Sequence, residues 1–258
     1  MKALVNTLWG LAAAAFVVFL LAPLGLVILF SFTDRAISAF PINALSLQWW
    51  ETMAANPQFR PALVNSLIIG GAVGVISALI GTMAAMGFAR MPPRQSGIAI
   101  AILCLPLMLP PLVLAVSLLV FYVSIGMTLG RGSVILSHLL FTQPFVVIVV
   151  YARMLTFDWR VVESARDLGA SPLRAFLTVT LPIIQPTVIG AALIAVALSI
   201  DDFVITFFTI GSGNTLPTFV WGMIRTALRP TVNAIGTLII LLTIGSTLIA
   251  LWLTRYRG

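Results

Sequence analysis

Six long apolar runs, separated by short polar segments, dominate the pattern along the chain. They cover residues 8–32, 62–89, 97–122, 133–153, 183–210 and 233–254. At about 1.5 Å per residue, each run is long enough as a helix to cross roughly 30 Å of hydrocarbon. An open sheet would leave backbone groups unpaired in lipid, and the alternating pattern of a barrel strand is absent. The pattern therefore predicts an all-α membrane protein whose residues 1–258 form one domain with six spans.

Two segments modify this pattern. Residues 33–60 contain Trp49 and Trp50 among polar residues, which favours a short helix anchored at the headgroups by its indoles; a plain connecting loop is the alternative. In the third run, Pro106, Pro110 and Pro111 stand where a soluble helix would break. A membrane bundle tolerates such breaks where neighbouring helices or cavity water bind the freed carbonyls.

Composition and charge narrow the function. The chain has only 14 basic and 7 acidic side chains among 258 residues, too few to cover a soluble domain of this size. The net charge of +7 does not indicate nucleic acid, because the arginines lie at the ends of apolar runs and form no stripe. The single Cys104 excludes an intrachain disulfide. Motifs for hydrolases, metal sites and phosphate-binding loops are absent, so we expect no enzymatic activity and no bound metal or cofactor in this chain.

The distribution of basic residues predicts an orientation, since Lys and Arg are enriched on the cytoplasmic side. With the N-terminus inside, nine basic residues face the cytoplasm and five face out. The inner set is Lys2, Arg90, Arg94, Arg153, Arg160, Arg166, Arg174, Arg255 and Arg257, and the outer set is Arg35, Arg60, Arg131, Arg225 and Arg229. Both termini are therefore predicted to be cytoplasmic.

A charged, glycine-containing loop, residues 158–182, separates the fourth and fifth runs on the predicted cytoplasmic side. Gly169 permits a tight turn, and Ser171 followed by Pro172 is a typical helix start. The loop is thus predicted to form two short helices that project as a docking element. A generic amphipathic loop is the alternative, because short motifs also arise by chance.

The loop also carries a recognisable motif. Its residues Glu163, Ala165, Gly169 and the pair Leu181 and Pro182 match the pattern Glu-Ala-Ala, three residues, Gly, nine residues, Ile, one residue, Leu-Pro, with Ser164 and Val179 as mild departures. This pattern resembles the cytoplasmic loop of permease subunits in bacterial ATP-binding-cassette importers.

Other segments extend the resemblance over nearly the whole chain. They are Asn65-Ser66-Leu67, Phe88-Ala89-Arg90, Leu105-Pro106, Pro144-Phe145-Val146, the stretch Ser199 to Phe208 and the final TLPTFVWGMIRTALRPTVNAIGTL. Together they are similar to the second permease subunit of spermidine/putrescine importers, the PotC/PotI type.

That resemblance implies a type I ABC importer permease fold with six transmembrane helices and a cytoplasmic coupling helix, in the bacterial inner membrane. It also implies partners: a second homologous permease, two cytoplasmic ATPase subunits that hold ATP and Mg, and an extracytoplasmic substrate-binding protein. The coupling residues it implies are Glu163, Ser164, Ala165, Arg166, Gly169, Ala170 and Pro182.

Asp201 and Asp202 are the only carboxylates deep within a predicted span. A charge at mid-bilayer costs at least about 2.5–3.5 kcal/mol unless it faces water or a partner, so a role in the substrate path is the first interpretation. About 18 residues beyond Ile183, and so roughly 27 Å along the helix, they would lie in the outer half of the span. A carboxylate there could bind the ammonium groups of a polyamine. Alternatively, one aspartate caps a kinked half-helix or pairs with Arg225 or Arg229.

Three further residues are candidates for the same path. His138, the single histidine, could contact cargo or sense pH, but a buried neutral imidazole bonded to a neighbouring helix is the simpler interpretation. Tyr122 and Trp221 could offer aromatic faces to an ammonium, although such residues are also common near membrane interfaces.

Other functions remain open at this level. The cargo could be ferric iron or an amino-acid-like or phosphonate compound, since the loop motif indicates mechanism and not cargo. Paired intramembrane carboxylates also suit an ion-gradient-driven transporter, although the chain shows no internal repeat that would favour one.

Overall fold

The computed structural model describes residues 2–226 and 229–255, and Arg257 of the basic count lies outside them. Within these ranges the chain is helical, and its only extended pairing is one isolated bridge between Thr33 and Leu45. The chain divides into two compact units, described separately below: residues 1–60 with 219–241, and residues 61–218 with 242–258.

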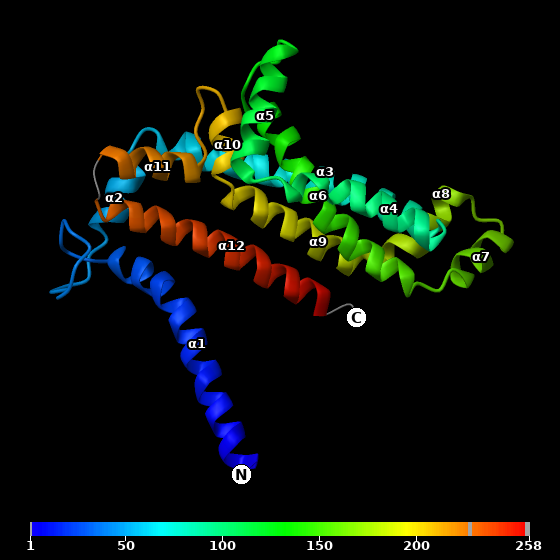
Figure 1. Ribbon diagram of the computed structural model, residues 1–258, viewed down its shortest axis with the longest axis horizontal. Coiled ribbons are helices and arrows are strands. Elements are labelled where there is room, and N and C mark those ends of the chain that lie inside the picture. Colours follow the sequence, from blue (N-terminus) through cyan, green and yellow to red (C-terminus); the bar gives the residue numbers. More distant parts are fainter. Residues whose placement is uncertain (1, 227–228, 256–258) are drawn as a thin grey trace. The chain divides into compact units, whose positions relative to one another are not determined.

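The helices follow one another along the chain as labelled in Figure 1. Their bounds are α1 Lys2–Phe30, α2 Gln48–Ala55, α3 Phe59–Ala89, α4 Pro93–Cys104, the 3₁₀ turn η1 Leu105–Met108, α5 Pro111–Ser124, α6 Arg131–Leu155, α7 Arg160–Asp167, α8 Pro172–Ala175, the π-helical turn η2 Phe176–Thr180, α9 Leu181–Asp201, α10 Val204–Thr209, α11 Leu216–Thr226 and α12 Thr231–Arg255. In the described residues, five helices are long and apolar enough to span a membrane, and one bent pair makes a sixth.

The third predicted span, 97–122, is that bent pair. The helical segments Pro93–Met108 and Pro111–Ser124 meet at 94°, so the break indicated by the prolines is a sharp bend. The prolines explain the bend, because a residue before proline is driven out of the helical region. Leu109 precedes Pro110 and Pro110 precedes Pro111, and both have extended backbone with ψ of 139° and 133°.

The fifth predicted span, 183–210, is corrected at both ends. The helix continues without a break from Pro172 to Asp201, so the second helix of the loop is the first part of the span itself. Pro182 lacks an N–H and crowds the preceding turn, and the π-helical turn η2 lies directly before it. At the other end Asp202 is extended, with ψ of 124°, and a separate six-residue helix, α10, follows.

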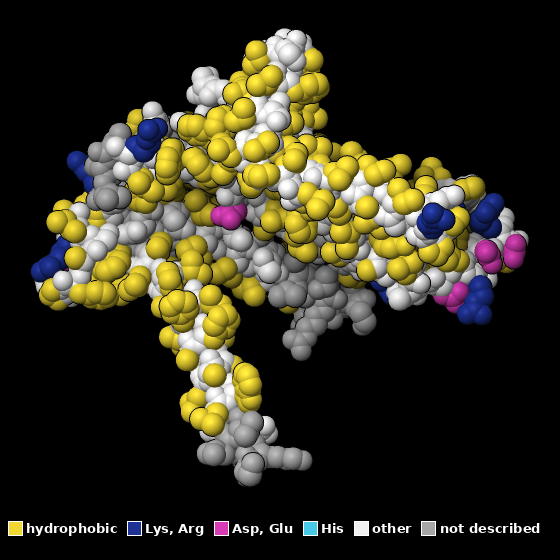
Figure 2. All heavy atoms as spheres, in the orientation of Figure 1, with side chains coloured by type: hydrophobic (Ala, Val, Ile, Leu, Met, Phe, Trp, Pro, Cys, Tyr) yellow, Lys and Arg dark blue, Asp and Glu magenta, His cyan; other side chains and the backbone are white. Residues whose placement is uncertain are grey.

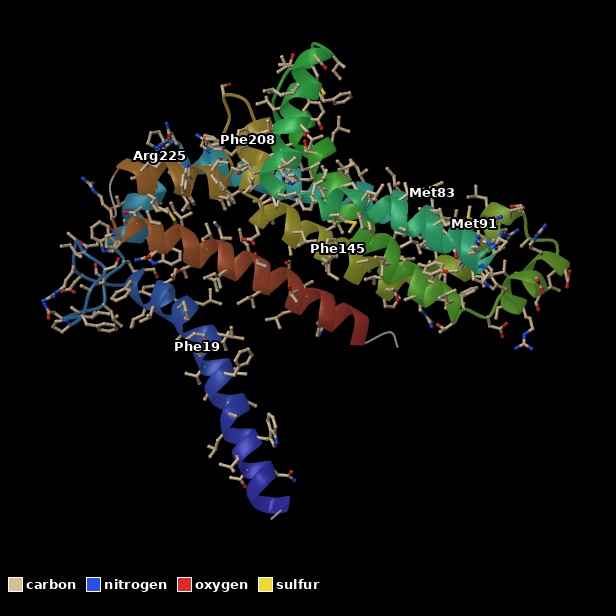
Figure 3. All side chains as sticks on the ribbon, in the orientation of Figure 1. Phe19, Met83, Met91, Phe145, Phe208 and Arg225 are labelled. Carbon is tan, nitrogen blue, oxygen red and sulfur yellow. The ribbon has the colours of Figure 1, made fainter. Side chains whose placement is uncertain are left out.

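The larger unit has its core between α3, α6 and α9. Fully buried residues from all three helices meet there, among them Val73, Val146 and Ala191. Helices α3 and α9 approach closely because α3 presents glycine: a Cβ built on Gly74 would lie 2.4 Å from Val196 Cγ2. Outward-facing side chains are large and apolar, including Met83 and Phe145, labelled in Figure 3, as a lipid-facing surface requires.

The smaller unit contains the predicted short helix of segment 33–60, which is α2 and therefore confirmed. Trp49 Nε1 donates to the carbonyl of Thr33 at 2.8 Å, and the Trp50 ring stacks on Phe32. The following loop is tied to α12 by Asn233 Nδ2, which donates to Ser38 Oγ at 2.7 Å. Along α1 the apolar side chains are exposed, and Phe19, labelled in Figure 3, is 75% exposed.

Candidate coupling surface and transport cavity

Charged side chains gather at one end of the larger unit, over α7, α8 and the neighbouring helix ends (Figure 2). The same end carries the C-terminus of α3, the N-terminus of α4 and the C-terminus of α6. Only three residues separate α3 from α4, and four separate α6 from α7. Six of the basic residues predicted to face the cytoplasm belong to these segments: Arg90, Arg94, Arg153, Arg160, Arg166 and Arg174. Helices α7 and α8 with the turn between them, residues 160–175, are called the knob below.

The turn of the knob has defined hydrogen bonds. Gly169 adopts φ of +90°, its N–H donates to the carbonyl of Arg166, and the N–H of Ala170 donates to the carbonyl of Ala165. These two bonds form the Schellman motif that ends many helices with a left-handed glycine. Ser171 then caps α8 by accepting from the N–H of Arg174, with Pro172 at the first helical position. The predicted turn between two helices is confirmed, with the second helix continuing into the fifth span.

The knob is anchored on one side and exposed on the other. Val162 and Ala175 are buried in the core of the unit, and Ala165 and Ala170 pack against it. Glu163, Ser164, Arg166 and Gly169 are exposed. A hollow of about 430 Å³ lies among Glu163, Arg166, Gly169 and Pro172. The small size of Ala165 thus serves packing inside the unit.

Two exposed leucines at the knob were missed by the sequence argument. Leu168 is 90% exposed and Leu173 is 67% exposed, on either side of the turn. The signal in the sequence was a leucine directly before Gly169 and another directly after Pro172. The coupling motif does not specify the residue type at either position.

At the base of the knob, two contacts hold α7 in place. The guanidinium of Arg90, just beyond α3, lies 4.4 Å from the centre of the Trp159 ring, a cation–π contact. Arg160 donates to Asp158 through Nε and Nη2. This side-chain hydrogen bond lowers the pKa of Asp158 and raises that of Arg160. The pair is exposed and screened by water, so its contribution to stability is small.

A cavity of about 440 Å³ lies at the other end of the same unit, where the two broken spans meet. The bend of the third span contributes Pro106, Leu109 and Pro111, and the break of the fifth contributes Asp201, Asp202 and Phe203. Helix α10 packs on α5 beside it, and Figure 3 labels Phe208 at this contact. The walls are apolar apart from the two carboxylates.

The two aspartates have different surroundings. Asp201, the last residue of α9, is exposed, and its carboxylate makes no hydrogen bond or ion pair with any residue that the structure describes. The side chain of Asp202 is only 14% exposed, and its Oδ2 accepts from Thr206 N at 2.8 Å and lies 3.2 Å from His138 Nε2. The alternative that one aspartate caps a kinked half-helix is therefore confirmed for Asp202.

The other candidates of the substrate path do not line this cavity. His138 is fully buried and bonded to α9 and α10, so the burial and the bond to a neighbouring helix in its simpler interpretation are confirmed. Tyr122 is also buried, with its hydroxyl 3.0 Å from Ser137 Oγ. Trp221 belongs to α11 in the smaller unit, where Arg225 lies 5.8 Å from its ring centre. Instead, Phe141 and Phe203 supply the aromatic wall, and nothing in their local sequence marked them for this role.

Comparison with known proteins identifies a matching family and relatives that align with most of the chain. Residues 77–257 match the family described as binding-protein-dependent transport system inner membrane component. The chain is 33% identical to the spermidine/putrescine transport system permease protein PotC of Shigella flexneri, covering 93% of this chain and 92% of that protein. It is 32% identical to the putrescine transport system permease protein PotI of Escherichia coli K12, covering 86% and 82%.

Solved structures show the same fold. The crystal structure of a bacterial ABC transporter involved in the import of alginate superposes with a TM-score of 0.75 at 18% identity, covering 99% of this chain and 96% of that one. A chain of the inward-facing MetNI methionine ABC transporter gives 0.61 at 19% identity, covering 78% and 96%. From the family match, the identity to these permeases and the shared type I fold, the chain belongs to the binding-protein-dependent transport system inner membrane components, as a permease subunit of an ABC importer.

Proposed function

We propose that this permease forms part of the path of a polyamine importer and is driven by ATP hydrolysis on separate subunits. The observation that carries the proposal is the unbroken helix Pro172–Asp201. It begins in the knob and ends at the free carboxylate of the cavity. At 1.5 Å per residue its 30 residues extend about 45 Å, so a displacement of the knob moves the cavity wall directly.

The partners follow from the family. A second homologous permease would complete the path, two cytoplasmic ATPases holding ATP and Mg would receive the knobs, and an extracytoplasmic binding protein would deliver cargo. The exposed side of the knob supports this assignment, because Glu163 and Arg166 offer charge and Leu168 and Leu173 offer apolar contact. Closure of the ATPases would shift the knobs and alternate access to the cavity.

The proposed location is the bacterial inner membrane with the knob and both termini in the cytoplasm. The clustering of six arginines at the knob end supports this orientation. Arg131, at the start of α6, lies at the opposite end of that helix from Arg153.

The chemistry of the cavity supports a cationic cargo. Asp201 presents a carboxylate that pairs with none of the described residues to an otherwise apolar cavity, where a charge-assisted hydrogen bond to an ammonium is strong. Phe141 and Phe203 add aromatic faces that attract cations. The named relatives transport spermidine and putrescine, so we infer a di- or tricationic amine. Family membership argues against the ion-gradient alternative.

Reconstitution with the partner subunits tests the coupling role. Glu163→Arg or Gly169→Asp is expected to abolish coupled hydrolysis and amine uptake, because both residues are exposed on the knob and each change places a new charge there. Arg94→Glu is the matched control, since Arg94 is exposed at the same end but outside the knob. Transport that is unchanged by the two knob variants would refute the docking role.

Cargo is tested at the cavity. Asp201→Asn is expected to reduce spermidine uptake at least about tenfold, as loss of one charge-assisted hydrogen bond implies, while hydrolysis by the partner ATPases persists. If uptake kinetics remain unaltered, with Asp202→Asn added as well, the cationic path is wrong and cargo of another class must be sought.

A further inference from the structure

His138 joins three helices at the break of the fifth span. Its Nδ1 lies 2.7 Å from Ser199 Oγ on α9, and its Nε2 lies 2.9 Å from Thr206 Oγ1 on α10. The same Nε2 lies 3.2 Å from Asp202 Oδ2. The imidazole comes from α6 and is fully buried. A buried ring with polar partners on both nitrogens holds one orientation.

The contacts of the ring call for a proton on Nε2 and allow a second one on Nδ1. Thr206 uses its hydroxyl hydrogen to donate to Asp202 Oδ2 at 3.0 Å, so its oxygen is left to accept from His138 Nε2–H. On the other side, the Ser199 hydroxyl can accept from a protonated Nδ1 or donate to a bare one, so the charge of the ring is decided by what Asp202 needs. Asp202, whose side chain is 14% exposed, needs a counter-charge because an unpaired carboxylate is costly in a membrane interior.

We propose that His138 is a positioning residue that pairs with Asp202 as an imidazolium and cancels its charge. The cavity then presents one net negative charge, that of Asp201, although two carboxylates line it. For amine cargo this inference rests on the proposed function: a single free carboxylate binds one ammonium group and still permits release, whereas two would retain a dication. The charge assignment itself does not depend on the cargo.

The charge of the cavity can be measured without any amine. In a Cys104→Ser background, Asp201→Cys places a thiol at the cavity wall and leaves Asp202 as the remaining carboxylate. The assembled transporter is treated with a positively charged and a negatively charged methanethiosulfonate reagent of similar size. The rate with the positive reagent divided by the rate with the negative reagent reports the local charge. A nearby carboxylate attracts the first reagent and repels the second, so it raises this ratio.

With His138 present, the rate ratio is expected to change less than about twofold when Asp202→Asn is added, because a paired carboxylate contributes little field. His138→Leu should raise the ratio at least about threefold by freeing the charge of Asp202. Adding Asp202→Asn to His138→Leu should restore the original ratio. Because Asn still accepts from Thr206, the Asp202→Asn arm remains informative if His138→Leu does not fold.

A thiol introduced by Leu168→Cys, 90% exposed on the knob, is the matched control, and its ratio should not respond to His138. A purely structural role for His138 would alter both reagent rates by the same factor. Equal changes of both rates, or a ratio that falls at least threefold with Asp202→Asn alone, would overturn the proposal. Failure of the polyamine assignment would appear separately, as absence of amine uptake with this charge pattern intact.

Discussion

At the scale of single residues, Gly169 shows how one backbone conformation supports the coupling surface. Its φ of +90° is one that side-chain-bearing residues rarely adopt. A Cβ at this position would meet no atom within 4 Å. Any cost of substitution therefore comes from backbone strain and not from a clash.

Gly169→Ala is expected to cost about 1–2 kcal/mol in the turn. The turn should open more often, so that ATP hydrolysis becomes less tightly coupled to uptake while the protein still inserts and assembles. The ratio of amine imported to ATP hydrolysed measures this effect. Gly97→Ala is the control, since Gly97 is an exposed helical glycine of α4 with equally open surroundings, and a similar loss of coupling there would contradict the argument.

At the scale of elements, the contact between α3 and α9 depends on small residues. Cβ atoms built on Gly70 and Gly74 would lie 2.8 Å from Ile200 Cγ1 and 2.4 Å from Val196 Cγ2. The two glycines are four positions apart and so lie on one face of α3. Because lipid offers no hydrophobic drive to join helices, such close packing is what holds α9 to α3.

Gly74→Leu is expected to destabilise the larger unit by about 1–3 kcal/mol through overpacking. A lower midpoint of thermal aggregation in detergent would show it. Gly71→Leu is the matched control, because a Cβ on Gly71 meets nothing within 4 Å. Equal loss in both variants would mean that leucine is poorly tolerated anywhere on α3, and the specific contact would lose its support.

At the scale of the whole molecule, the proposed orientation places the knob and the α5–α6 connection on opposite sides of the membrane. The connection, residues 125–130, links α5 to the N-terminus of α6, whereas the knob follows the C-terminus of α6. A helix of 25 residues between them is long enough to cross the bilayer.

Single-cysteine labelling tests this orientation. In a Cys104→Ser background, Thr128→Cys should react with a membrane-impermeant maleimide in intact spheroplasts, whereas Leu168→Cys should react only after permeabilisation. Both positions are exposed. The reverse pattern would invert the orientation and remove the knob from the side where ATP is available.

The sequence by itself determined the features that depend on local chemistry. The lengths of the apolar runs predicted the helical class and the number of spans. Gly169, Ser171 and Pro172 predicted the turn of the knob, since each of these residues restricts only the backbone and hydrogen bonds of its near neighbours in the chain. The prolines of the third run indicated a break, because proline restricts its own and the preceding residue. The motif from Glu163 to Pro182 gave the family.

Only the tertiary structure decided what meets across the chain. His138 binds Ser199 and Thr206, which are 61 and 68 positions away, and no local pattern encodes such a pairing. The cavity exists because the breaks of the third and fifth spans lie against each other, which brings Phe141 and Phe203 to its wall and leaves Tyr122 outside. The different surroundings of Asp201 and Asp202 depend on the end of α9 between them and on the contacts of Asp202 with His138 and Thr206, and these contacts form only when α6, α9 and α10 pack together.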